Sequence, residues 1–204
     1  MRLFIALDID DAIRERIRTF LDGVREFAPE ARWVRPESLH VTLKFIGEKP
    51  PEAAAAIKHA LAAVRGGPFK LAIQGYGFFP TPKAPRVFWI GIQAELKLAR
   101  LAEAADNATA ALGIPKETHP FSPHLTLARG AGGSGAPRWR KGDRPNRNFQ
   151  RLQEKLAAMP PLEFGTMTAR EFFLYQSRLS QEGAHYTKLK RFALEAKNSS
   201  PESL

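Results

Sequence analysis

The sequence contains no cysteine, which excludes disulfide bonds, thiolate zinc sites and a cysteine nucleophile. It also lacks an apolar run long enough to span a membrane. Its first residues, Met1 to Asp8, reach an acidic side chain too early for a signal peptide and indicate a first buried strand instead. We therefore expect a cytoplasmic protein without a membrane segment.

Acidic residues are scarce relative to basic ones: 21 Asp and Glu face 31 Lys and Arg, which gives a formal net charge of +10. This excess favours polyanionic partners such as nucleic acid or nucleotides, although a solubilising surface produces similar totals. The apolar fraction of 44% is ordinary for a globular protein. A chain of 204 residues is long enough for one sizeable core or for two small lobes that share one.

Two segments nearly repeat each other: His40-Val41-Thr42-Leu43 and His124-Leu125-Thr126-Leu127. As β-strands, each places its histidine and threonine on one face and its aliphatic residues on the other, because successive side chains alternate. The same alternation places Phe45 on the apolar back of the first strand. We therefore expect two strands that line a polar cleft. A third triplet, His185-Tyr186-Thr187, lies in a basic segment and is expected to be structural or exposed.

Hydrophobic periodicity and turn residues predict strands and helices in alternation. The predicted elements are a strand at the start, a helix between Asp10 and Pro29, the first histidine strand, a helix from Pro50 to Gly66, strands Phe69–Phe79 and Arg86–Ile92, a helix from about Glu95 to Leu112, the second histidine strand, a helix Phe149–Met159, and strands around Ala169–Gln176 and His185–Leu194. This order indicates an α+β fold of two pseudo-symmetric lobes, each with a small antiparallel sheet and outer helices, and a cleft between them. We expect one domain over residues 1–197 and a flexible tail over 198–204.

Residues 130–148 differ in composition from the rest of the chain. A glycine-rich run, Gly130 to Pro137, precedes a basic run that contains Trp139. One interpretation is a solvated insertion. The other is a basic flap that follows a phosphate backbone and stacks a base on Trp139.

Three chemistries compete with a purely structural role for His40 and His124. A metal site needs three or four ligands, and neither segment has a carboxylate or a second histidine at ligand spacing. A serine nucleophile would need a Gly-x-Ser-x-Gly turn, which the sequence lacks. In paired acid–base catalysis, one neutral and one protonated imidazole act on opposite sides of a phosphorus centre. Thr42 and Thr126 would then donate hydrogen bonds to the non-bridging oxygens.

The twin segments resemble the paired signature of the two-histidine phosphoesterase superfamily. Within it, the chain is similar to the bacterial and archaeal RNA 2′,3′-cyclic phosphodiesterases, formerly called 2′–5′ RNA ligases. The resemblance covers nearly the whole chain. Its further matching stretches are Arg2 to Asp8, Phe45 to Glu48, Pro120 to His124, Arg129, and Tyr186 to Leu194.

This resemblance implies a role for each residue of the twin segments. His40 would be the proton donor to the leaving oxygen, and His124 the proton acceptor that activates water. Thr42, Thr126 and Arg129 would bind the phosphate. No metal and no other cofactor is implied.

The alternation of side chains argues against Arg129 as a phosphate-binding residue. Strict alternation puts its side chain on the back of the second strand, so the strand must end or twist at Ala128 for Arg129 to reach a phosphate. Phe45, His119 and Trp139 are further candidates for substrate contact. His119 stands where the related proteins often have an arginine or a lysine.

The implied reaction hydrolyses an RNA-terminal 2′,3′-cyclic phosphate to a 2′-phosphomonoester. The expected substrates are RNA with such ends, tRNA fragments among them, and nucleoside 2′,3′-cyclic phosphates, and the expected oligomeric state is a monomer. Two alternatives stay open. One is 2′–5′ RNA ligation, which is the same chemistry in reverse, and the other is a non-catalytic RNA-binding module that uses the basic surface.

Overall fold

The computed structural model describes residues 1–130, 147–180 and 183–195. The predicted tail, Trp139 and most of the predicted basic flap lie outside the described residues. No helix in the described ranges is long and apolar enough to cross a membrane.

Strands and helices follow one another along the described chain much as the periodicity predicts. The elements are β1 (Arg2–Asp8), α1 (Asp11–Val24), η1 (Arg25–Phe27), β2 (Arg32–Trp33), η2 (Pro36–Ser38), β3 (His40–Glu48), α2 (Ala53–Ala62), β4 (Phe69–Phe79), β5 (Val87–Ala94), α3 (Leu96–Ala110), β6 (His124–Arg129), α4 (Gln150–Ala157), β7 (Glu163–Ala169), β8 (Glu171–Ser180) and β9 (Gly183–Ala193).

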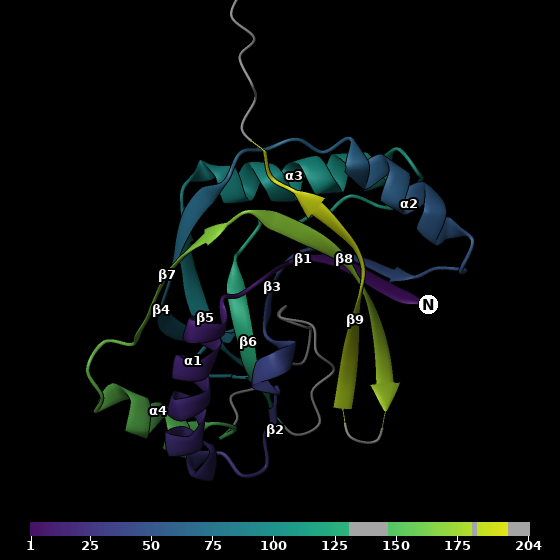
Figure 1. Cartoon of the computed structure of the whole chain (residues 1–204). Coiled ribbons are helices and arrows are strands. Elements are labelled where there is room, and N and C mark those ends of the chain that lie inside the picture. The colour runs from purple at the N-terminus through teal and green to yellow at the C-terminus, as the bar shows by residue number, and fades with distance from the viewer. Residues whose placement is uncertain (131–146, 181–182, 196–204) are drawn as a thin grey trace, which may run out of the picture.

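The strands form two antiparallel sheets (Figure 1). The first sheet has the order β3-β1-β8-β9, and the second has the order β2-β6-β5-β4-β7. Each histidine strand pairs with a strand inside its own sheet, β3 with β1 and β6 with β5. The two histidine strands also contact each other, so the sheets meet along β3 and β6. The predicted α+β fold of two similar lobes is confirmed.

Neither lobe is a continuous piece of the chain. The first sheet combines β1 and β3 with β8 and β9, which follow more than a hundred residues later. The second sheet takes most of its strands from the middle of the sequence. The lobes are therefore interleaved, although the order of elements along the chain suggests two successive repeats.

The helices pack on the outer side of the sheets (Figure 1). Helices α2 and α3 contact each other, and α3 also contacts β3 of the first sheet, at the top of the view. Helix α1 contacts β7 of the second sheet instead. It buries Ile13, Ile17, Leu21 and Val24 at helical spacing.

Strand β1 shows how the first sheet divides its two faces. Leu3, Ile5 and Leu7 join the main hydrophobic core, which the helices share. Phe4 and Ala6 point the other way and form a small separate cluster with two aromatic residues of β8. The ring of Phe4 lies 4.7 Å from that of His40. This second face therefore carries the histidine.

Candidate active site

The two histidines begin β3 and β6 and make the same hydrogen bond. Nδ1 of His40 lies 2.7 Å from the carbonyl oxygen of Ser38, and Nδ1 of His124 lies 2.7 Å from that of Ser122. A carbonyl oxygen only accepts hydrogen bonds, so Nδ1 carries the proton in both rings. Each neutral imidazole therefore has an unprotonated Nε2, the atom that can accept a proton and later donate it.

Strands β3 and β6 share an extra residue at the same place relative to the histidine, and β3 has a second one at Ile46. The pairing of β3 with β1 shifts by one residue at Leu43, and that of β6 with β5 shifts by one at Leu127. Such a β-bulge reverses the face toward which the following residues point. Lys44 and Ala128, each directly after the bulge, are consequently buried.

The two bulges turn Phe45 and Arg129, each the fifth residue after its histidine, toward the histidine faces. Phe45 is 53% exposed, and its ring lies 6.3 Å from that of Phe4, the neighbour of His40. The predicted position of Phe45 on the apolar back of its strand is therefore wrong. Arg129 was expected to reach a phosphate only if its strand ended or twisted at Ala128. The bulge at Leu127 supplies that change of direction, and Arg129 is half-buried.

Aromatic rings surround His40. The ring centroid of Phe4 lies at 4.7 Å, that of Tyr186 at 5.1 Å in an edge-on arrangement, and that of Tyr175 at 6.2 Å. From the sequence, Tyr186 stood out only within the third triplet and the family resemblance, and Tyr175 did not stand out. Their positions follow from the sheet order β3-β1-β8-β9, in which β8 pairs with β1 and β9 pairs with β8.

His124 has aromatic neighbours of its own from β4 and β5. Phe79 lies edge-on with its centroid at 5.0 Å, and Trp89 lies at 6.2 Å. The indole of Trp89 covers Gly77, where a Cβ atom would lie only 2.2 Å from Cζ2 of the indole. A glycine at position 77 therefore makes room for the ring that flanks His124.

Burial in these surroundings lowers the pKa of both histidines. The pKa of His40 falls from 6.5 to about 4, mainly because burial disfavours the charged ring. Burial is also the main cause that lowers the pKa of His124. The guanidinium of Arg129 lowers both values further, so it lies close enough to interact with both rings. Without a ligand, both imidazoles are neutral at pH 7.

Asp8 makes the two histidines unequal. It stands opposite His40 across the β1–β3 pair, whereas the residue opposite His124 is Gly91. Burial acts to raise the pKa of Asp8, but a hydrogen bond from Lys188 at 2.5 Å and other favourable contacts lower it overall. The carboxylate is therefore ionised, and its charge favours protonation of His40. Nothing in the sequence pattern marks Asp8 as part of the site.

Thr42 and Thr126 lie two residues after the histidines, on the same faces, and both are half-buried. Neither hydroxyl makes a hydrogen bond to another residue within the described ranges. Both are consequently available to an anion between the strands. Their phosphate-binding role stays a prediction.

The histidines outside this pair do not build a second site. His119 is exposed, and its Nδ1 lies 2.8 Å from the hydroxyl of Thr118, so its role in substrate contact stays a prediction. His59 and His185 are exposed as well. No three His, Asp or Glu side chains of the described segments are grouped so that they could hold a metal ion.

Two equivalent strands thus present a histidine, a threonine and one further side chain to a shared site, on two sheets that meet along those strands. An arginine lies close to both imidazoles. This arrangement defines the class of protein, a two-histidine phosphoesterase.

The family follows from sequence comparison. The model of the LigT-like phosphoesterase family matches residues 7–89 and 90–186, one match for each histidine strand. The chain therefore belongs to the LigT-like phosphoesterase family, as the sequence motifs predicted, and it is an enzyme with phosphoesterase activity.

Named relatives match over nearly the full length. An RNA 2′,3′-cyclic phosphodiesterase of Archaeoglobus fulgidus is 36% identical over 192 residues, which cover 94% of this chain and 99% of that protein. A protein of the same name from Thermus thermophilus is 34% identical, over 95% of this chain and 90% of that protein.

Solved structures agree with the fold. The protein TT0787 of Thermus thermophilus superimposes with a TM-score of 0.74 at 30% identity, over 97% of this chain and all of that one (100%). Escherichia coli LigT, crystallised with 3′-AMP, gives a TM-score of 0.73 at 31% identity, over 95% of this chain and 97% of that one.

Proposed function

We propose that this phosphoesterase hydrolyses RNA-terminal 2′,3′-cyclic phosphates to 2′-phosphomonoesters, with His40 and His124 as acid and base and without a metal ion. The matched hydrogen bonds of the two Nδ1 atoms carry this proposal, because they leave both Nε2 atoms available beside one arginine. The substrate class is supported by the relatives named RNA 2′,3′-cyclic phosphodiesterase, at 36% and 34% identity.

The proposed reaction is an in-line displacement at phosphorus. Nε2 of His124 accepts a proton from a water molecule while the water oxygen forms a bond to phosphorus. The P–O3′ bond breaks, and Nε2 of His40 donates its proton to O3′. The products are a 3′-hydroxyl and a 2′-phosphomonoester. A positioned general acid or base typically contributes about 10²–10⁴-fold in rate.

The charge of Asp8 supports His40 as the acid. A bound phosphodiester adds a negative charge between the two rings, and this charge raises the pKa of both. Only His40 also faces a carboxylate across its strand pair, and in this scheme that charge supports the protonated ring. His124, opposite Gly91, remains the base.

The remaining site residues hold the substrate in this scheme. The hydroxyls of Thr42 and Thr126 donate hydrogen bonds to the non-bridging oxygens, and Arg129 neutralises their charge. Phe45, which is 53% exposed on the histidine face, offers a ring on which the base of the terminal nucleotide stacks.

The test uses a nucleoside 2′,3′-cyclic phosphate with wild type, His40→Asn and His124→Asn. We expect the wild type to form the 2′-monophosphate at a rate that EDTA leaves unchanged. Each variant should lose at least about 10²-fold in kcat, because one proton transfer is removed. The exposed His185→Asn serves as the matched control. Full activity in either site variant, inhibition by EDTA, or a 3′-monophosphate product would overturn the proposal.

Two further experiments distinguish hydrolysis from 2′–5′ RNA ligation and from a non-catalytic RNA-binding module. Incubation of an RNA with a 2′,3′-cyclic end and an RNA with a 5′-hydroxyl end at high concentration would yield a 2′–5′ joined product if ligation dominated. A binding module would form no product, and it would retain its RNA affinity in the His40→Asn and His124→Asn variants.

A further inference from the structure

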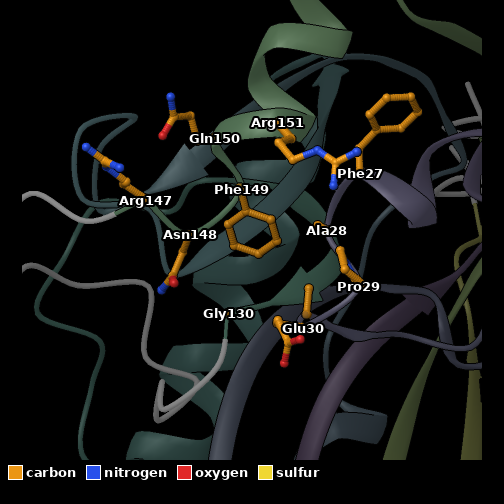
Figure 2. A pocket seen from close by; sticks show the side chains of 11 residues that line it. Phe27, Ala28, Pro29, Glu30, Gly130, Arg147, Asn148, Phe149, Gln150 and Arg151 are labelled. Carbon is orange, nitrogen blue, oxygen red and sulfur yellow. The ribbon is translucent and has the colours of Figure 1, made fainter.

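A cavity of about 360 Å³ lies at the end of β6, outside the set of catalytic candidates (Figure 2). Two stretches of chain supply most of its lining, the one between η1 and β2 and the one that leads into α4. Its volume falls in the range of about 300–1,000 Å³ that is usual for small-molecule sites. Neither histidine of the pair lines it.

The cavity lies next to two arginines, Arg32 and Arg129, of which Arg129 belongs to the active site. Its lining includes Ala31 and Gly130, which directly neighbour Arg32 and Arg129 in the sequence. Arg32 and Arg129 are partners across the β2–β6 pair. Arg129 also interacts with both catalytic histidines through its charge. A polynucleotide with its terminal phosphate between the histidines can therefore continue past Arg129 into this cavity.

Phe149 provides the apolar part of the lining. Its backbone has φ of +64°, a conformation that bulky residues rarely adopt, and its side chain is only 5% exposed. The segment packs tightly on the end of β6, since a Cβ atom at Gly130 would lie 3.0 Å from Nδ2 of Asn148. Figure 2 shows the Phe149 ring at the centre of the cavity, with Pro29 across from it. The exposed Pro29 offers an apolar surface to a nucleobase, and the nearly buried Phe149 ring completes the apolar lining.

Two arginines give this apolar cavity a positive rim. Arg147 and Arg151 line it from the segment around Phe149, and both are exposed. Glu30 is the acidic residue of the lining. Neither arginine forms an ion pair with another residue in the described ranges, so both can bind phosphate.

We propose that this cavity is a subsite for the nucleotide that precedes the cyclic-phosphate end of an RNA substrate. Its base packs on the exposed Pro29, and its phosphate lies beside Arg147 and Arg151. This inference rests on the proposed function of the histidine pair. It makes the protein selective for oligonucleotides over single nucleotides.

The experiment compares three substrates that share one terminal 2′,3′-cyclic phosphate. They are a mononucleotide, a dinucleotide, and the same dinucleotide with an abasic first residue. The enzymes are the wild type, an Arg147→Gln/Arg151→Gln variant and a Lys97→Gln/Arg100→Gln control. The control removes the same charge from exposed positions on α3, at the opposite end of the molecule from α4 (Figure 1).

We expect the wild type to prefer the dinucleotide by at least about tenfold in kcat/KM, and to lose this preference with the abasic substrate. The arginine variant should lose about tenfold for the dinucleotide, equivalent to ~1.4 kcal/mol, mainly through a higher KM. Its kinetics on the mononucleotide should match those of the wild type. The α3 control should keep the dinucleotide preference.

Other results would contradict either the subsite or the proposed function. Unchanged dinucleotide kinetics in the arginine variant would overturn the subsite. An equal loss for mononucleotide and dinucleotide, or the same loss in the α3 control, would also overturn it, because the effect would then be general attraction of an anion. A wild type that hydrolyses neither the mononucleotide nor the dinucleotide would instead contradict the proposed function.

Discussion

Lys44 and Asp106 form a buried ion pair between β3 and α3. Lys44 is 2% exposed, and its Nζ also donates a hydrogen bond to the carbonyl of Pro115 at 2.6 Å. The carboxylate of Asp106 accepts a hydrogen bond from the backbone amide of Glu117 at 3.2 Å. The pair therefore ties the strand of His40 to the segment that leads to His124.

Breaking this pair should destabilise the fold. Lys44→Met leaves Asp106 as a largely buried charge without its partner, which typically costs about 3–5 kcal/mol in the free energy of unfolding. The double variant Lys44→Met/Asp106→Leu should recover much of that loss, because it leaves no uncompensated charge. Urea unfolding at pH 7 measures both. A double variant no more stable than Lys44→Met would contradict this explanation.

Neutralising Asp8 should change the pH dependence of the reaction. Asp8→Asn removes the charge that favours protonated His40, so the pKa of His40 falls further. We expect kcat/KM at pH 7 to drop about tenfold, the effect of one pKa unit, and the deficit to shrink as the pH is lowered. Lys188→Gln removes a cation that partly neutralises Asp8, and it should shift the profile the opposite way. A constant deficit at all pH values would indicate a structural role only.

The low pKa of His40 should also appear in the stability of the protein. The folded-state value of about 4 lies below the ordinary 6.5, so between these values the unfolded chain binds the proton more readily. Stability is therefore lost as the pH falls through this window. In His40→Gln, the free energy of unfolding should decrease less between pH 7 and pH 4.5 than in the wild type. Urea unfolding at the two pH values tests this, and equal decreases would contradict the assigned pKa.

Phe45 should contribute to substrate binding and little to folding, since it is 53% exposed on the histidine face. Stacking on a base is worth about 1–3 kcal/mol, so Phe45→Ala should raise KM at least about fivefold with kcat nearly unchanged. Phe45→Tyr, which keeps the ring, should behave like the wild type. If Phe45→Ala instead lowers the melting temperature and leaves KM unchanged, the ring serves the fold.

The histidine strands were predictable because their alternation is local. The bulges at Leu43 and Leu127 were not, because a bulge depends on the register of the partner strand rather than on its own residues. This one difference explains why the sequence placed Phe45 on the wrong face. It also explains the burial of Lys44, a residue type that rarely enters a core.

Long-range pairing accounts for most of what the sequence did not reveal. Strand β7 was not predicted because its sequence is interrupted by Gly165, which has a positive φ of +116°. Its pairing with β4 defines it. Asp8 joins the site through register with His40, and Tyr175 joins it through the pairing of β8 with β1. Such contacts leave no periodic pattern within a single segment.

The interleaved lobes have a consequence for synthesis of the protein. Strand β1 pairs on one side with β3 but on the other with β8, near the opposite end of the described chain. While the chain leaves the ribosome, β1 must wait as an exposed edge until Glu171–Ser180 has emerged. The rings of Tyr175 and Tyr186 reach His40 only once β8 and β9 have both emerged. Nascent chains that end before β8 should therefore be inactive and prone to aggregate, and both halves of the site should mature together at the end of translation.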